Sequence, residues 1–402
     1  MIKLKNHITL SLGYFIIAAI LGVVLRSFHA IEIPVNYKFI VHTHSHIALL
    51  GWVYMGLTTL LYKLFLEEQE LALRYRRIFW FTQFTLVGML LTFPFQGYAF
   101  LSIIFSTLFL IASYWFAGFF IRNVPASYKK TQSFICVKFA LWYMVLSSLG
   151  PWALGAIMNT LGAESIWYRL SIYFYLHFQY NGWMILGLLG VFIYILKRIG
   201  IKIPKATFNR FFWSINLGIV LSFFLSTLWV KPHIILFFVG GLGALLQIMA
   251  FGMLLLLGIK CKEKLFHALT PLQRNMLFMV IVLVGIKILL QLLTAIPYFA
   301  AMAASITDLT IGYLHWTFLG VVTIGLLLFL NYFKLLQLSS RAYYLYLLGF
   351  FLTETLIFTK GIIAWQRLSL FNGYFEALAI SSFLIPLALV FLLVTNQKRS
   401  VD

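Results

Sequence analysis

The sequence is poor in charged residues, since Asp, Glu, Lys and Arg together make up only 10% of its 402 residues. A soluble domain carries about 25%, so this chain has too few charges to cover a surface that faces water. Hydrophobic residues reach 62% and fall into runs of about 20 or more, the length that crosses roughly 30 Å of hydrocarbon. A soluble helical bundle would show a charged face on each helix, and none is found. We therefore predict an all-α membrane protein.

Acidic residues are the scarcest charged class, with 10 Asp and Glu against 30 Lys and Arg, a net charge of +20. Of the 30 basic residues, 22 lie at the N-terminus or at the exits of even-numbered spans. Three more lie inside spans, and only five lie on the opposite side: Arg26, Lys38, Arg169, Lys231 and Arg367. The positive-inside rule then predicts two cytoplasmic termini, which requires an even number of spans. We expect the membrane to be the bacterial cytoplasmic (inner) membrane. The basic residues indicate topology and contact with anionic lipid, so no nucleic acid partner is expected.

Cysteine is nearly absent. Cys136 and Cys261 both lie near the predicted cytoplasmic ends of spans, so neither a disulfide nor a thiolate metal site is expected. The N-terminal apolar segment is long enough to span and has no convincing small-x-small cleavage site, so we expect it to be retained as the first helix.

The apolar runs predict one transmembrane domain, residues 1–402, and no soluble domain. The loops on the predicted outer side are short and nearly uncharged, so any function lies within the bilayer or at its edge. The predicted spans are 8–28, 38–63, 78–96, 98–121, 134–160, 166–196, 211–229, 232–259, 276–303, 312–334, 343–364 and 374–395.

A short pattern, His-x4-Gly followed by a bulky apolar residue, recurs in spans two, six and ten. It begins at His46, His177 and His315, which are 131 and 138 residues apart. Each copy opens a span that runs from the outer to the inner side. We therefore predict twelve transmembrane helices in three pseudo-repeated arcs of four, at about 1–130, 131–270 and 271–402.

Histidines gather at the predicted outer side. An ionisable group inside a bilayer is costly and therefore suggests a function. A single histidine near a span end, such as His29 or His233, is more typical of a hydrogen bond at the membrane interface. The seven outer histidines are His29, His42, His44, His46, His177, His233 and His315.

His42, His44 and His46 form the densest group. His42 and His46 share a helix face and can bind one metal together, while His44 faces a neighbouring pocket. Neutral imidazole suits haem iron and copper. The glycine five residues after each repeat histidine leaves room either for a flat macrocycle or for close helix packing.

The run His44-Ser-His46-Ile-Ala-Leu-Leu-Gly51-Trp52 is similar to the H-x-H-x3-L-G-W of cbb3-type oxidases, where it lies in span ten. Together with twelve spans and histidines in spans two, six and ten, the chain resembles subunit I of the haem–copper oxidases and nitric-oxide reductases. Short oxidase-like chains with this motif in span two are the most similar.

The resemblance implies a b-type haem between His44 (or His42) and His315. It also implies copper or another metal at His177, with His46, and places Arg367 where the family pairs arginines with haem propionates. The family's reactive-haem ligand is replaced by Tyr313, and span seven, residues 211–230, has no copper-binding histidine. We therefore expect electron transfer or binding of O2 or NO, with a cytochrome or other membrane subunits as partners, and leave enzymatic turnover undecided.

Two other functions fit the sequence. The histidines can serve a transporter of metal, haem or a small solute, although Pro94, Pro151 and Pro297 lie near predicted outer span ends rather than at the midplane expected of broken transporter helices. A cofactor-free assembly subunit is the other. Within spans, Lys287 with Gln291 and Glu354 with Lys360 are candidates for proton relays, while Lys287 can instead pair with a carbonyl or snorkel.

Overall fold

A computed structural model describes residues 3–398 of the chain, and within that range it is helical with no strand. Twelve helical segments are long and apolar enough to cross a membrane, which confirms the predicted number. The protein is therefore an integral membrane protein embedded in a lipid bilayer. The three segments that carry the repeat histidines have the largest buried shares, 89%, 83% and 67%.

One predicted span is wrong at its C-terminal end. Residues 276–303 were expected to form one helix, but α14 (Pro271–Leu293) ends ten residues earlier and α15 (Pro297–Ser305) begins anew. Proline lacks an N–H and disfavours helical backbone at the residue before it. Ile296 accordingly has extended backbone, with φ −88° and ψ 124°.

The chain divides into two compact units. Unit 1 comprises the chain up to Pro125 and the chain from Leu326 on, and unit 2 comprises Ala126–Gly325. The boundary falls inside α17 (Thr323–Tyr332).

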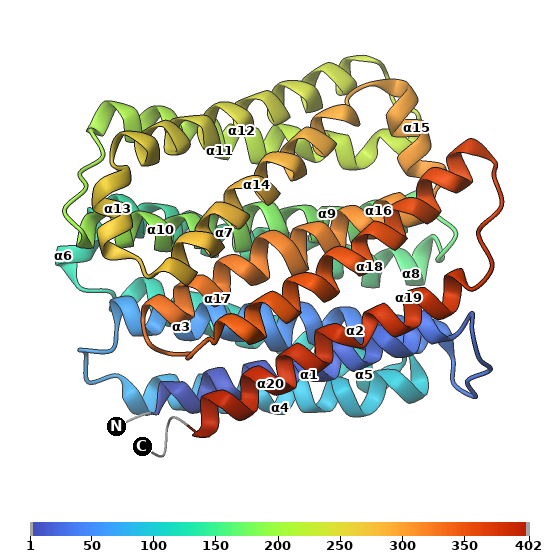
Figure 1. The fold of residues 1–402 in the computed structure, drawn as a ribbon, viewed down its shortest axis with the longest axis horizontal. Helices are drawn as coiled ribbons and strands as arrows, with labels where there is room; N and C mark the ends of the chain where they lie inside the picture. Colours follow the sequence, from blue (N-terminus) through green and yellow to red (C-terminus); the bar gives the residue numbers. More distant parts are fainter. Residues whose placement is uncertain (1–2, 399–402) are drawn as a thin grey trace. The chain divides into compact units, whose positions relative to one another are not determined.

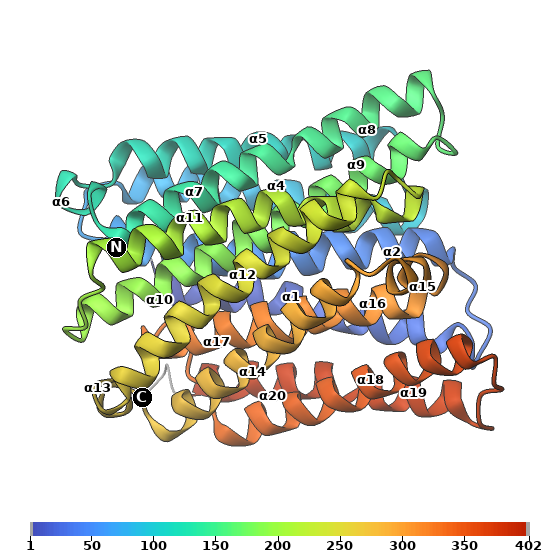
Figure 2. The ribbon, with the colours of Figure 1, turned by 90° about the horizontal axis from the view of Figure 1, so that it is seen from above.

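Unit 1 is assembled around its first helix. α1 contacts α2, η1, α3, α19 and α20, and α4 packs against both α2 and α5. Figure 1 shows α1 beside α20, and Figure 2 shows α18 next to α20. Besides part of α17, its elements are α1 (Leu4–Ser27), α2 (Tyr37–His46), η1 (Ile47–Tyr54), α3 (Met55–Phe65), α4 (Ala72–Gln96), α5 (Phe100–Asn123), α18 (Ser340–Gln366), α19 (Tyr374–Ser382) and α20 (Leu384–Lys398).

Unit 2 holds the remaining elements. α7 packs against α10 and η2, α11 against α12, and α14 against both α12 and η4; α11 and α12 lie side by side in Figure 1. Its further elements are α6 (Ala126–Lys129), α7 (Gln132–Ser147), α8 (Leu149–Thr160), α9 (Ile166–His177), η2 (Phe178–Ile185), α10 (Leu186–Arg198), α11 (Lys205–Ser222), η3 (Phe223–Val230), α12 (Ile235–Lys260), α13 (Lys262–Ala268), α16 (Thr307–His315) and η4 (Trp316–Val322).

Candidate functional site

Each repeat histidine is the last residue of an α-helix that continues directly into a π-helix. His46 precedes η1, His177 precedes η2 and His315 precedes η4. π-helical segments are rare, occur mostly as single-turn bulges and are frequent at functional sites. The same irregularity therefore follows the same residue of the His-x4-Gly pattern in all three copies.

At two of the repeat glycines, a tyrosine of the preceding span fills the space that a side chain would take. A Cβ placed on Gly51 would lie 2.7 Å from Cβ of Tyr14, and one on Gly182 would lie 2.5 Å from Cβ of Tyr143. The Tyr14 hydroxyl donates in turn to Oε1 of Gln83 at 2.9 Å. Of the two readings of these glycines, close helix packing is therefore the one observed at Gly51 and Gly182.

His44 is oriented by the first helix. Its Nδ1 lies 2.8 Å from the carbonyl oxygen of Ala18, and because a carbonyl only accepts, Nδ1 carries the proton and the lone pair of the neutral ring is on Nε2. Gly22 allows this approach, since a Cβ there would lie 3.2 Å from Cε1 of His44. The ring is thus fixed against α1 in the tautomer that binds a metal through Nε2.

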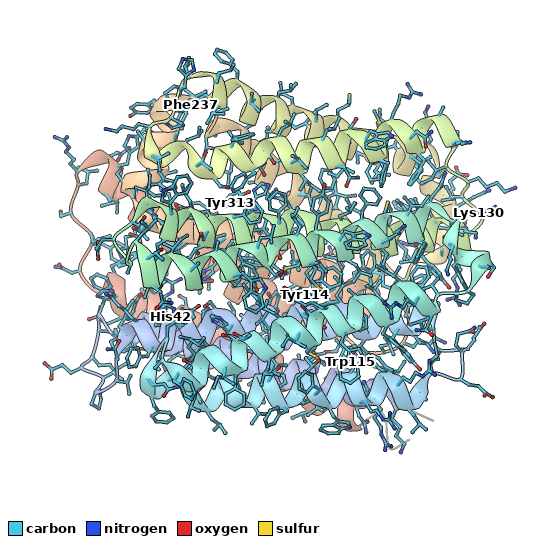
Figure 3. All side chains as sticks on the ribbon, turned by 180° about the vertical axis from the view of Figure 1, so that it is seen from behind. His42, Tyr114, Trp115, Lys130, Phe237 and Tyr313 are labelled. Atoms are coloured by element: carbon cyan, nitrogen blue, oxygen red, sulfur yellow. The ribbon has the colours of Figure 1, made fainter. Side chains whose placement is uncertain are left out.

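His42 and His46 lie on one side of α2, as the sequence predicts. They are linked by a hydrogen bond to the His42 backbone carbonyl and by Tyr98, which contacts both rings. The Nδ1 of His46 donates to the carbonyl oxygen of His42 at 2.8 Å, and the Tyr98 hydroxyl donates to its Nε2 at 3.3 Å. The rings of His42 and Tyr98 are 4.6 Å apart, and His46 stacks on Phe93 at 4.5 Å. Both nitrogens of His46 are therefore engaged by protein; Figure 3 labels His42.

His177, the predicted copper ligand of span six, is almost fully buried, with 1% of its surface exposed. Its Nε2 donates to the carbonyl oxygen of Ile219 at 2.8 Å. Its Nδ1 then accepts from Nδ2 of Asn181 at 3.3 Å and faces the Ser226 hydroxyl at 3.4 Å. Both ring nitrogens are thus used within the protein.

Lys287 lies beside this histidine and extends the polar cluster to α14 and α16. Its side chain is 1% exposed, and Nζ donates to Oδ1 of Asn181 at 2.5 Å and to Oε1 of Gln291 at 2.6 Å. The hydroxyl of Tyr313, labelled in Figure 3, donates to the same Gln291 oxygen at 3.2 Å. The ring centre of Tyr180 lies 5.5 Å from Nζ. Lys287 therefore neither snorkels nor pairs with a helix carbonyl.

The other predicted site residues lie in simpler surroundings. His315 is half-buried at the end of α16, and the next residue, Trp316, donates from its indole nitrogen to the Leu283 carbonyl at 3.0 Å. Arg367 is exposed and ends α18 with left-handed backbone, φ 56°. Glu354 is buried and interacts electrostatically with Arg26.

The predicted site residues are divided between the two units. His42, His44, His46 and Arg367 belong to unit 1, whereas His177 and His315 belong to unit 2. No group of three or more His, Cys, Asp or Glu side chains in residues 3–398 is arranged to hold a metal ion.

Sequence reasoning missed Asn181, which joins His177 to Lys287. A signal was present, because Gln179 and Asn181 place two amide side chains within three residues of a mainly apolar span. Both are buried, and buried polar side chains need hydrogen-bond partners.

A scan against models of known protein families finds no match, and a search of curated proteins finds none either. The established description of this chain is that of a multi-span α-helical membrane protein, with polar side chains grouped around two of its repeat histidines.

Proposed function

We propose that this chain binds haem near its outer face and uses it to carry electrons or to bind a diatomic gas such as O2 or NO. The observation that carries the proposal is the hydrogen bond from Nδ1 of His44 to the Ala18 carbonyl. Metal-binding histidines almost always donate their second ring N–H to a carbonyl or carboxylate, which fixes the tautomer and orients the ring. His44 has this arrangement and its neutral Nε2 suits haem iron.

The resemblance to haem–copper oxidase subunit I assigns the second axial ligand to His315. A haem held by two histidines, with no thioether bond between haem and protein, corresponds to the b type. Arg367 is the candidate partner for a propionate. The π-helical segments after His46, His177 and His315 support a threefold repeat of four helices. When bound, the haem supplies a reversible one-electron iron couple, while His44 orients it and the buried span excludes water.

We propose no second metal centre. A metal on His177 would displace its bonds to Ile219 and Asn181, and a metal on His46 would displace Tyr98 or the His42 carbonyl. These donor sets do not fit copper without rearrangement. The proposed function is therefore electron transfer, or binding of a gas that would have to displace one of the two histidines, without oxygen reduction by the oxidase mechanism.

Visible spectra of purified variants test the ligand assignment. We expect His44→Ala and His315→Ala to lose the Soret band of a six-coordinate low-spin haem, while His42→Ala and the exposed control His233→Ala keep it. Retention of an unchanged spectrum by both His44→Ala and His315→Ala would refute the proposal. A histidine-dependent uptake of metal or solute without retained haem would instead support a transporter.

A further inference from the structure

The side-chain amine of Lys287 has no acidic partner within residues 3–398. Its contacts in residues 3–398 are two neutral amide oxygens and the ring of Tyr180. The acidic residues of unit 2 are Glu164, Glu263 and Asp308, and none of them forms an ion pair with it. A charge buried in a membrane protein is costly unless it is paired.

The side-chain amide of Gln291, beside Lys287, also needs a hydrogen-bond acceptor. Gln291 is 6% exposed, and its Oε1 already accepts from Lys287 and Tyr313. Its Nε2 is buried and has no hydrogen-bond partner in the described part of the chain. A buried donor left without an acceptor is destabilising, so this atom also indicates a missing acceptor.

The two amide side chains of the cluster cannot supply that acceptor by turning around. The amide of Asn181 is held at both ends, because Nδ2 donates to His177 while Oδ1 accepts from Lys287. Turning either amide would place an N–H against the ammonium. Lys287 and Gln291, both on α14, therefore have more hydrogen-bond donors than the acceptors around them can satisfy.

We propose that Lys287 and Gln291 bind a small monovalent inorganic anion of the size of chloride. The anion accepts from Nζ of Lys287 and from Nε2 of Gln291, and it neutralises the buried ammonium. The site uses residues of unit 2 only and requires no haem, so it stands independently of the function proposed above.

Thermal unfolding of the purified full chain in lipid nanodiscs tests this, with chloride replacing gluconate at constant ionic strength and tryptophan fluorescence as the readout. We expect chloride to raise the wild-type Tm in a saturable manner by about 2 °C or more. Lys287→Met should abolish the response. Lys138→Met, which removes another lysine from a span of unit 2, should leave it intact.

Gln291→Glu is the decisive variant, because it keeps the side-chain shape and places a carboxylate beside Lys287. We expect this variant to lose the chloride response and to have a Tm at or above that of chloride-free wild type. A flat wild-type titration, the result if water alone fills the site, would overturn the proposal. A wild-type response in Lys287→Met or Gln291→Glu would overturn it equally. Repeating the titration on haem-free and haem-loaded protein keeps the result separate from haem binding.

Discussion

His44 and His177 present opposite tautomers to their surroundings. His44 donates from Nδ1 to Ala18, whereas His177 donates from Nε2 to Ile219 and accepts at Nδ1 from Asn181. The nitrogen that a haem iron most often takes, Nε2, thus bears the lone pair in His44 and the proton in His177. The proposed haem ligation by His44 therefore uses the tautomer whose Nε2 bears the lone pair, whereas the ring nitrogens of His177 are both used in hydrogen bonds.

Replacing His177 tests its structural role. His177→Leu leaves the Ile219 carbonyl and the Asn181 amide buried without partners, so we expect it to lower the free energy of unfolding by about 2–4 kcal/mol. His233→Leu, at an exposed position, should be close to neutral. Treating wild-type protein with a chelator should leave its Tm unchanged. A fall in Tm on chelation that His177→Leu abolishes would show that His177 binds a metal after all.

The glycines of the repeat make a second residue-level prediction. Gly51→Ala and Gly182→Ala force a Cβ to within 2.7 Å and 2.5 Å of Tyr14 and Tyr143, and overpacking of this kind costs about 1–3 kcal/mol. Gly13 and Gly118 are matched helical controls with nothing within 4 Å of the added Cβ. Their alanine variants should be neutral or gain up to about 1 kcal/mol. Equal unfolding midpoints for all four variants would contradict the packing.

Two of the departures from regular α-helix bear on what hydropathy can detect. The π-helical segments η1, η2 and η4 hold the repeat glycines within continuous spans. The other departure separates α14 from α15 at Pro297. Because hydropathy averages over a whole window, it detects neither a bulge nor a break whose flanking residues are apolar.

Cysteine labelling tests the break and the predicted orientation together. In a chain with Cys136→Ser and Cys261→Ser, Ile296→Cys places a thiol at an extended residue that is 48% exposed. We expect a membrane-impermeant maleimide to label it from the outside of intact cells. Ile288→Cys, on α14 and 2% exposed, is the protected control. Labelling of Ile296→Cys only after the membrane is opened would contradict the orientation.

For the whole molecule, the sequence predicted the helical class, the number of spans and which spans carry the repeat histidines, because apolar length is a property of local sequence. The contacts that distinguish the sites were not predictable in the same way. Lys287 and Gln291 are four residues apart, a spacing readable from a helix, but Asn181 lies 106 residues from Lys287. Which side chain meets which lysine depends on tertiary packing.

Haem binding by the purified full chain is measured by a pyridine haemochrome assay. The protein should be produced in haem-replete cells and measured for haem and protein in the same sample. We predict one b-type haem retained per chain, lost in His44→Ala but not in His42→Ala. Wild-type protein that is folded by its unfolding profile, yet carries no haem and takes up none when haem is added, would contradict the account.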